Sequence, residues 1–170
     1  MLELGSGCGM VGIAAAILGA RKTTLTDLSY TLPMMKANVE RNMSNIHIDH
    51  QIECAECDWF DPPPLVNLGF GVRATCCDDS TTTTCNVTVI LIADCVWVDD
   101  LVAPLLRTLR LYTDDDNAND CTVWISYQQR GSRAHELFWN GIHELFSSVV
   151  EVDIRSLVQS SVLHIFACRR

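Results

Sequence analysis

The first twelve residues constrain the fold of this chain more than any other segment. A short apolar stretch, Leu2–Leu4, contains one acid and leads into the sequence GSGCG, in which glycine stands at alternate positions. Glycine lets the backbone turn tightly and lets a ligand approach without meeting a Cβ atom. A helix is predicted next, over Met10–Leu18, and the free N–H groups at its start favour an anionic group. This strand–loop–helix unit is typical of a nucleotide-type cofactor site.

Strand and helix patterns alternate along the rest of the chain. The nearly continuous apolar run Val87–Ala93 predicts a central strand that is buried on both faces. Val149–Ile154 and Val162–Cys168 are too close for a helical crossover, so we expect them to pair as an antiparallel hairpin. The chain therefore predicts an α/β fold with a mostly parallel, twisted, Rossmann-like sheet, helices on both faces and this C-terminal hairpin. The other predicted strands are Thr23–Thr26, Ile52–Cys57 and Thr122–Tyr127, and the other predicted helices are Leu32–Asn42, Leu101–Leu109 and Leu137–Phe146.

The length of 170 residues corresponds to about one domain. Residues Gly69–Asn86 interrupt the pattern, because they are biased in composition and have no apolar period. We expect this segment to be a mobile surface insertion without regular structure. Since the glycine loop follows Met1 so closely, we also expect that an N-terminal segment of the domain is missing from this sequence.

Composition excludes several classes of partner. A net charge of −9 argues against a nucleic-acid binder, and no apolar run is long enough to span a membrane. Nine cysteines without a secretory signal favour reduced thiols, so we expect a cytoplasmic protein, with the nucleus left open. Cys54 and Cys57 have the spacing of a zinc knuckle, but no second pair completes it, and we expect no metal site.

Acidic residues mark the carboxyl ends of the predicted strands. Three of the first four strands end at an aspartate, namely Asp27, Asp58 or Asp94, and the remaining one ends in the glycine loop. Ligands of such sheets bind outside these strand ends. Asp27 follows Gly5 by 22 residues, which suits an acid that binds ribose hydroxyls, although a turn or helix cap would also explain it. Glu3 lies between two leucines, so a buried partner is expected for its carboxyl group.

Longer motifs resemble a known family. The stretch ELGSGCG resembles motif I of the class I, seven-stranded S-adenosylmethionine-dependent methyltransferases. The set ELGSGCGMVGIAAAILGA, TLTDL, NVERN, DW, IADCVW and ISYQQRGS resembles the family-16 protein-lysine methyltransferases over nearly the whole chain outside the insertion. This resemblance implies S-adenosylmethionine as the cofactor and lysine methylation of a protein substrate. Those enzymes modify chaperones, ATPases and translation factors, and we expect a monomer.

The resemblance also implies roles for individual residues. Asp94 and Trp97 match an acid-x-x-aromatic motif at the methyl-transfer site, where the family usually has tyrosine in place of the tryptophan, and Tyr127 would line the same pocket. The tryptophan ring keeps a cation–π contact with lysine but loses the hydroxyl group. Structural explanations stay open, with Asp94 as a helix cap and Tyr127 as a packed aromatic. The residues implied to bind the cofactor are Glu3, Gly5, Ser6, Gly7, Cys8, Gly9, Asp27, Leu28, Asp58, Trp59 and Ala93.

Two other functions remain open from the sequence. An NAD(P)-dependent oxidoreductase would use the same glycine loop, although no Tyr-x-x-x-Lys motif accompanies it here. A non-catalytic or truncated methyltransferase-like protein would explain why the loop stands at the start of the chain.

Overall fold

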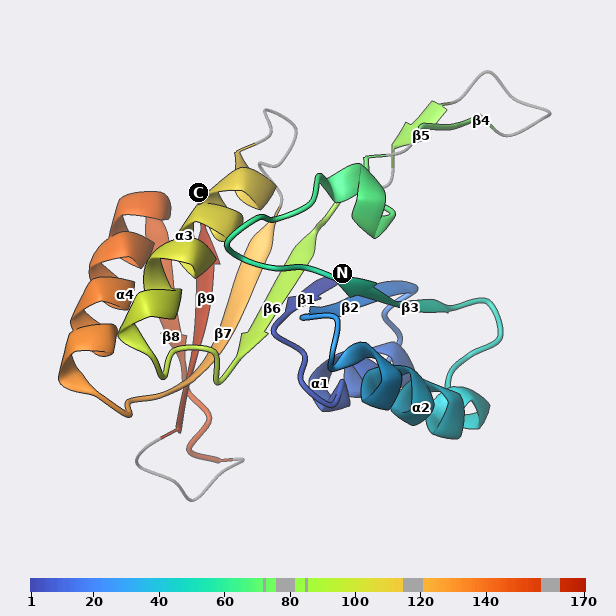
Figure 1. Ribbon diagram of the computed structural model, residues 1–170, viewed down its shortest axis with the longest axis horizontal. Coiled ribbons are helices and arrows are strands. Elements are labelled where there is room, and N and C mark those ends of the chain that lie inside the picture. The colour runs from blue at the N-terminus through green and yellow to red at the C-terminus, as the bar shows by residue number, and fades with distance from the viewer. Residues whose placement is uncertain (72, 76–81, 85, 115–120, 157–162) are drawn as a thin grey trace.

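The computed structural model describes residues 1–71, 73–75, 82–84, 86–114, 121–156 and 163–170 (Figure 1). Strands and helices alternate as the sequence predicts. None of the described helices is long and apolar enough to cross a membrane. The elements are β1 (Leu2–Leu4), α1 (Met10–Ile17), β2 (Lys22–Asp27), α2 (Leu32–Asn42), β3 (Gln51–Glu56), β4 (Arg73–Thr75), β5 (Thr82–Thr84), β6 (Val89–Ala93), α3 (Asp99–Thr113), β7 (Thr122–Gln128), α4 (Ser132–Leu145), β8 (Ser148–Val152) and β9 (Leu163–Arg169), with short 3₁₀ turns at Met43–Asn45 and Leu65–Leu68.

Within the described residues, seven strands form one sheet in the order β3-β2-β1-β6-β7-β9-β8. The pairs among β3, β2, β1, β6 and β7 are parallel, whereas β9 is antiparallel to both β7 and β8. The predicted fold class and the C-terminal hairpin are therefore confirmed. The strand order reverses between β1 and β6, and this switch point is where an open α/β sheet forms its ligand crevice.

The larger core lies between the sheet and the pair α3 and α4, which Figure 1 shows together on one side of the sheet. Alternate residues of β6 and β7, such as Ile90 and Ile125, are buried on this face. Helix α3 contributes Leu105 and Leu109, one turn apart, and α4 contributes Phe138. Burial of this apolar surface anchors the carboxyl ends of β6 and β7.

Helices α1 and α2 lie on the opposite side of the sheet over a smaller core (Figure 1). Ile13 of α1 and Met35 of α2 meet Leu25 of β2 there. Gly12 makes the close approach possible, because a Cβ atom at this position would lie 1.9 Å from Leu25 Cδ2. The packing fixes the start of α1 beside the ends of β1 and β2.

One row of side chains on this second face extends beyond the two helices. The cross-strand register places Glu3 and Leu25 in line with Leu91, Trp124 and Val150. Glu3 and Leu25 are buried, whereas Trp124 is 36% and Val150 56% exposed. The face is therefore well covered over β1 and β2 and open to solvent at β7 and β8.

The segment Gly69–Asn86 differs from its prediction. Strands β4 and β5 pair antiparallel as a separate two-stranded sheet, with Arg73 opposite Thr84. The expectation of no regular structure is thus wrong for these six residues, because a threonine-rich run is well suited to an extended strand pair. Residues 72, 76–81 and 85 lie outside the described part of the chain, and the predicted mobility is not tested.

Candidate active site

The glycine loop after β1 depends on left-handed backbone angles. Gly5, Gly7 and Gly9 have φ values of 68°, 54° and 83°. At Gly5 the space is closed as well, since a Cβ atom would lie 2.7 Å from Cys95 Sγ and 2.9 Å from Trp59 Cζ2. Only glycine satisfies both constraints, so the backbone of the loop forms a wall of the crevice directly.

Asp27, the last residue of β2, holds the loop from the neighbouring strand. The Gly7 N–H group donates to Asp27 Oδ2 at 2.7 Å, and the Leu28 N–H group donates to Asp27 Oδ1 at 2.7 Å. A carboxylate oxygen accepts more than one hydrogen bond, so both oxygens keep capacity for a ligand hydroxyl group. The predicted position of an acid at this strand end is therefore suited to a ribose.

Glu3 supports the loop from behind. Its side chain is 1% exposed, and Oε2 accepts the Gly12 N–H group of the first turn of α1 at 3.0 Å. Burial raises the pKa of this carboxyl group to about 7, while hydrogen bonds from Ser6 and Gly12 oppose the rise. The structure thus supplies the buried partner that was expected for this carboxyl group. The partner is the N–H group of Gly12 at the start of α1. Glu3 is not among the residues that line the cavity, and its contact with the cofactor stays a prediction.

A cavity of about 350 Å³ lies at the switch point, outside the carboxyl ends of the parallel strands. The charged residues that line it are Asp27, Asp58 and Asp94, with no basic residue among the described lining residues. The other predicted residues in the lining are Gly5, Gly7, Leu28, Trp59 and Trp97. Sequence reasoning missed Tyr30, Thr31, Cys57, Phe60, Cys95 and Leu101, and it included Glu3, Ser6, Cys8, Gly9, Ala93 and Tyr127, which are not among the lining residues.

The loop after β3 forms one side of the cavity and is held by α3. Tyr112 Oη donates to the carbonyl of Pro63 at 2.8 Å, and Thr108 Oγ1 donates to that of Trp59 at 3.4 Å. Arg107 donates to the carbonyl of Phe60. These contacts place Asp58, Trp59 and Phe60 along the cavity. Phe60 and Cys57 could have been found from the sequence, because they directly flank the predicted Asp-Trp pair.

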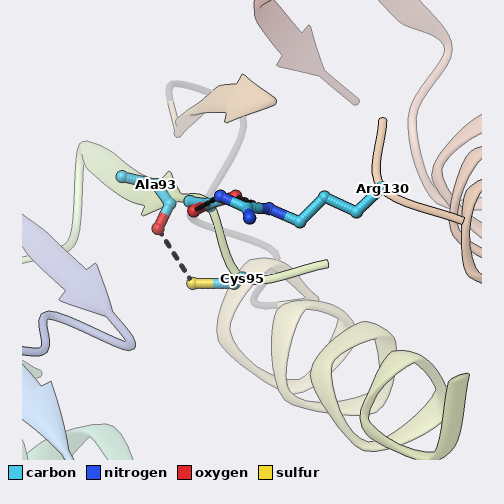
Figure 2. Close-up of polar contacts among 4 residues, drawn as sticks. Ala93, Cys95 and Arg130 are labelled. Carbon is cyan, nitrogen blue, oxygen red and sulfur yellow. Dashed lines mark hydrogen bonds and ion pairs between the residues drawn. The ribbon is translucent and has the colours of Figure 1, made fainter. Parts of the chain in front are cut away.

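Asp94 follows β6 in an unusual conformation. Its φ is 56°, a left-handed value that residues other than glycine rarely adopt. Its N–H group donates to the carbonyl of Ser126 at 3.0 Å, which ties the end of β6 to β7. Arg130 then donates from Nε to Asp94 Oδ1 at 3.0 Å and from Nη2 to Asp94 Oδ2. Figure 2 shows Arg130 reaching across to the turn that carries Ala93 and Cys95.

Arg130 was missed in the sequence, although it stands in the quoted motif ISYQQRGS. It lies in a connection, 36 residues away from its partner, and neither spacing nor periodicity joins the two. The hydrogen bonds and the charge of Asp94 raise the pKa of the guanidinium above its usual value. The pair is half-exposed, with Arg130 at 48% and Asp94 at 52%.

Cys95 joins β1 to β6 at the switch point. Its thiol donates to the carbonyl of Leu4 at 3.3 Å and lies 3.5 Å from the carbonyl of Ala93 (Figure 2). Burial raises the pKa of the thiol to about 12, so the group stays protonated and donates a hydrogen bond. Ala93, predicted to contact the cofactor, therefore contributes its carbonyl to this internal contact.

Tyr127 packs against α4 and is not among the residues that line the cavity. It is 4% exposed, its hydroxyl group lies 2.8 Å from His135 Nδ1, and its ring stacks on Phe138 of α4. Neighbouring residues of a strand point to opposite faces, so Tyr127 lies on the face covered by α4 and Ser126 on the other. The structure therefore shows Tyr127 as a packed aromatic, and its role at the methyl-transfer site stays a prediction.

Comparison with known proteins assigns this geometry to a family. The family model described as "Lysine methyltransferase" matches residues 1–145. The chain belongs to the lysine methyltransferase family. Among its relatives, the mouse (Mus musculus) protein N-lysine methyltransferase METTL21A is 33% identical over 108 residues, which cover 64% of this chain and 41% of that protein. The protein-lysine N-methyltransferase EFM6 of Saccharomyces cerevisiae is 27% identical over 158 residues, covering 89% and 58%. This lysine methyltransferase family member thus spans about half the length of the curated relatives it matches.

Solved structures show the same fold. Magnesium protoporphyrin IX methyltransferase from Synechocystis, solved with bound SAM, superposes with a TM-score of 0.61 at 10% identity, covering 99% of this chain and 69% of that one. Ribosomal protein L11 methylase from Lactobacillus delbrueckii gives a TM-score of 0.56 at 14% identity, covering 99% and 68%. At these identities the likeness extends to the fold alone.

Proposed function

We propose that this lysine methyltransferase family member carries the cofactor site and the methyl-transfer end of an S-adenosylmethionine-dependent protein-lysine methyltransferase. The observation that supports it most directly is the cavity at the switch point, which combines a glycine wall with three aspartates and no base among its described lining residues. S-adenosylmethionine carries a sulfonium cation, a ribose and an adenine. Carboxylate groups attract the cation and accept hydrogen bonds from the ribose and the adenine, so they suit this cofactor. The oxidoreductase alternative has no observation in its favour beyond the loop itself.

The residues of the cavity fit the parts of this cofactor. Asp27 has free acceptor capacity for the ribose hydroxyl groups, and Asp58 and Trp59 offer an acceptor and an apolar ring for the adenine. The space at Gly7 is open, since a Cβ atom there would meet no described atom within 4 Å beyond its chain neighbours, and this lets the ligand lie against the backbone. When bound, the cofactor supplies an electrophilic methyl group on its sulfonium sulfur.

Asp94 and Trp97 line the end of the cavity where we place the lysine that accepts the methyl group, and we call it the acceptor end. Trp97 is 61% exposed, so its ring face is available to a cationic side chain by a cation–π contact. Asp94 lines the same cavity and orients the ammonium group of a lysine before that group loses its proton. Because alignment of nucleophile, methyl and sulfur controls such a displacement, these two residues act by positioning.

The finer aspects of the function are proposals as well. A protein substrate is supported by the names of the relatives, which are protein-lysine methyltransferases, and one of them, from Xenopus tropicalis, is an EEF1A lysine methyltransferase. We propose a chaperone, an ATPase or a translation factor as the substrate. We also propose a monomer in the cytoplasm or nucleus.

Two experiments, carried out one after the other, test the proposed function. Calorimetric titration of the protein with S-adenosylhomocysteine and separately with NAD is expected to show binding of the first alone, and a response to NAD alone would overturn the proposal. Transfer of a labelled methyl group from S-adenosylmethionine into a matched cell lysate then identifies the substrate by mass spectrometry. Asp94→Ala is the control and is expected to remove the label. Tight cofactor binding without any transfer would favour a non-catalytic protein.

A further inference from the structure

The three aspartates that line the cavity differ in what they bind. Asp27 accepts two backbone N–H groups, and Asp58 Oδ1 accepts the Phe60 N–H group at 2.9 Å. Asp94 instead has both carboxylate oxygens bound by the guanidinium group of Arg130. The acceptor end of the cavity therefore already holds a cation beside its carboxylate, while the other two aspartates are bound by neutral donors.

The position of the Arg130 backbone is fixed by the start of α4. Arg130 immediately precedes Gly131, the N-cap of that helix. The first turn of α4 is fixed in turn to β7, because His135 Nδ1 lies 2.8 Å from the hydroxyl group of Tyr127. The backbone of Arg130 thus follows a strand and precedes an anchored helix, and the long side chain spans the remaining distance to Asp94.

The ion pair is not needed to join the two strand ends. The Asp94 N–H group already donates to the Ser126 carbonyl at 3.0 Å, and β6 and β7 are paired along their length. Because both members of the pair are about half-exposed, water competes for the same groups and exchange of the guanidinium for another cation costs little. A bidentate guanidinium also fixes the plane of the carboxylate, which a single point charge does not.

We propose that Arg130 is a positioning residue that acts through Asp94. Its guanidinium group orients and neutralises the carboxylate until the cationic amine of the acceptor takes its place. This inference rests on the proposed function, since it assigns the acceptor end of the same cavity. It predicts that the site favours acceptors that arrive as cations, and that removal of Arg130 strengthens the attraction of Asp94 for any cation placed there.

The test uses two cofactor analogues, so it does not require the substrate. S-adenosylhomocysteine has an uncharged sulfur, whereas sinefungin carries an amine in place of the sulfonium methyl group. Calorimetry gives the ratio of their affinities for the wild-type protein and for Arg130→Gln. We expect the ratio to shift toward sinefungin by about three- to fivefold in Arg130→Gln, the size expected for an exposed ion pair. Affinity for S-adenosylhomocysteine itself is expected to stay within about twofold.

Arg133→Gln is the matched control. Arg133 stands three residues further along and pairs with Asp99 at 3.5 Å, and neither of these two residues lines the cavity. The variant loses the same charge and is expected to keep the wild-type ratio. The double variant Arg130→Gln/Asp94→Asn is expected to lose the shift toward sinefungin, because the attraction for the sinefungin amine depends on the Asp94 carboxylate.

Several results would overturn the inference. An unchanged ratio in Arg130→Gln, or an equal shift in Arg133→Gln, would show that Arg130 has no specific effect on Asp94. Arg130→Met is a second neutral variant that keeps the aliphatic stem, and it has to reproduce the shift, whereas Arg130→Lys has to restore most of the wild-type ratio. Failure of the wild-type protein to bind S-adenosylhomocysteine would instead overturn the proposed function.

Discussion

At the scale of single residues, Gly5 and Gly7 separate two reasons for using glycine. Both have a left-handed φ, of 68° and 54°. A side chain at Gly5 would collide with Cys95 and Trp59, while a Cβ atom at Gly7 would meet no described atom within 4 Å beyond its chain neighbours. The first glycine is thus required by space and by conformation, and the second by conformation alone.

Replacement of these glycines by alanine distinguishes the two causes. Gly7→Ala is expected to lower the free energy of unfolding by about 1–2 kcal/mol, the cost of a left-handed residue with a Cβ atom. Gly5→Ala is expected to cost about 1–3 kcal/mol more, because Cys95 or Trp59 has to move, and to weaken S-adenosylhomocysteine binding at least about tenfold. Chemical denaturation and calorimetry measure both effects. Equal losses of stability in the two variants would contradict this account.

Glu3 predicts a pH dependence of stability. Its pKa is about 7 in the folded protein, above the ordinary value of 4.5, because burial penalises the charged form. The folded state therefore holds the proton more tightly, and the stability from this group is complete below about pH 4.5 and is lost as pH rises toward 7. Glu3→Gln keeps an acceptor for the Gly12 N–H group and removes the titration. The difference in unfolding free energy between the two proteins is expected to change by on the order of 2–3 kcal/mol between pH 4.5 and 7.5.

This comparison isolates Glu3, because every other titrating group is present in both proteins. Denaturant unfolding at a series of pH values measures it. Parallel pH profiles for the wild type and Glu3→Gln would show that Glu3 titrates normally.

At the scale of elements, α3 controls the loop after β3. Tyr112 is 2% exposed and donates from its hydroxyl group to the carbonyl of Pro63. Tyr112→Phe keeps the ring and is expected to lower the free energy of unfolding by about 1 kcal/mol, since the carbonyl loses its partner. Tyr30→Phe is the control, because Tyr30 is 78% exposed, and its effect is expected to stay near zero. Thermal and chemical denaturation decide, and equal effects would refute the role of the Tyr112 hydroxyl.

The elements also show where sequence reasoning succeeds and fails. The strand-end acids Asp27, Asp58 and Asp94 could be located because parallel strands share one carboxyl edge, which makes position along the chain a guide to position in space. The packing of Tyr127 against α4 could not be foreseen, because a shift of one residue along a strand reverses the face. Arg130 could not be found from the sequence. Its partner Asp94 follows a different strand, and the contact forms only because the long arginine side chain can reach that far.

At the scale of the whole molecule, the two faces of the sheet are covered unequally. Trp124 is exposed on a row that continues from the buried Leu25. An exposed apolar surface of this kind binds hydrophobic dyes. Trp124→Thr is expected to reduce the fluorescence of added anilinonaphthalene sulfonate at least about twofold. Leu137→Thr, at a 44% exposed site on α4, is expected to leave the fluorescence unchanged. An equal decrease in both variants would mean that the dye does not report on this row.

The thiols of the cavity have a consequence for the selectivity of the proposed reaction. Cys57 and Cys95 both line the space proposed for the cofactor, and burial raises the pKa of both groups. A thiolate is the reactive form of cysteine and would attack an electrophilic sulfonium methyl group. A raised pKa favours the protonated thiol at both positions, so the cofactor proposed for this cavity would lie beside two thiols and not beside two thiolates. In the proposed site, burial therefore keeps the sulfurs that face the cofactor in the less nucleophilic thiol form.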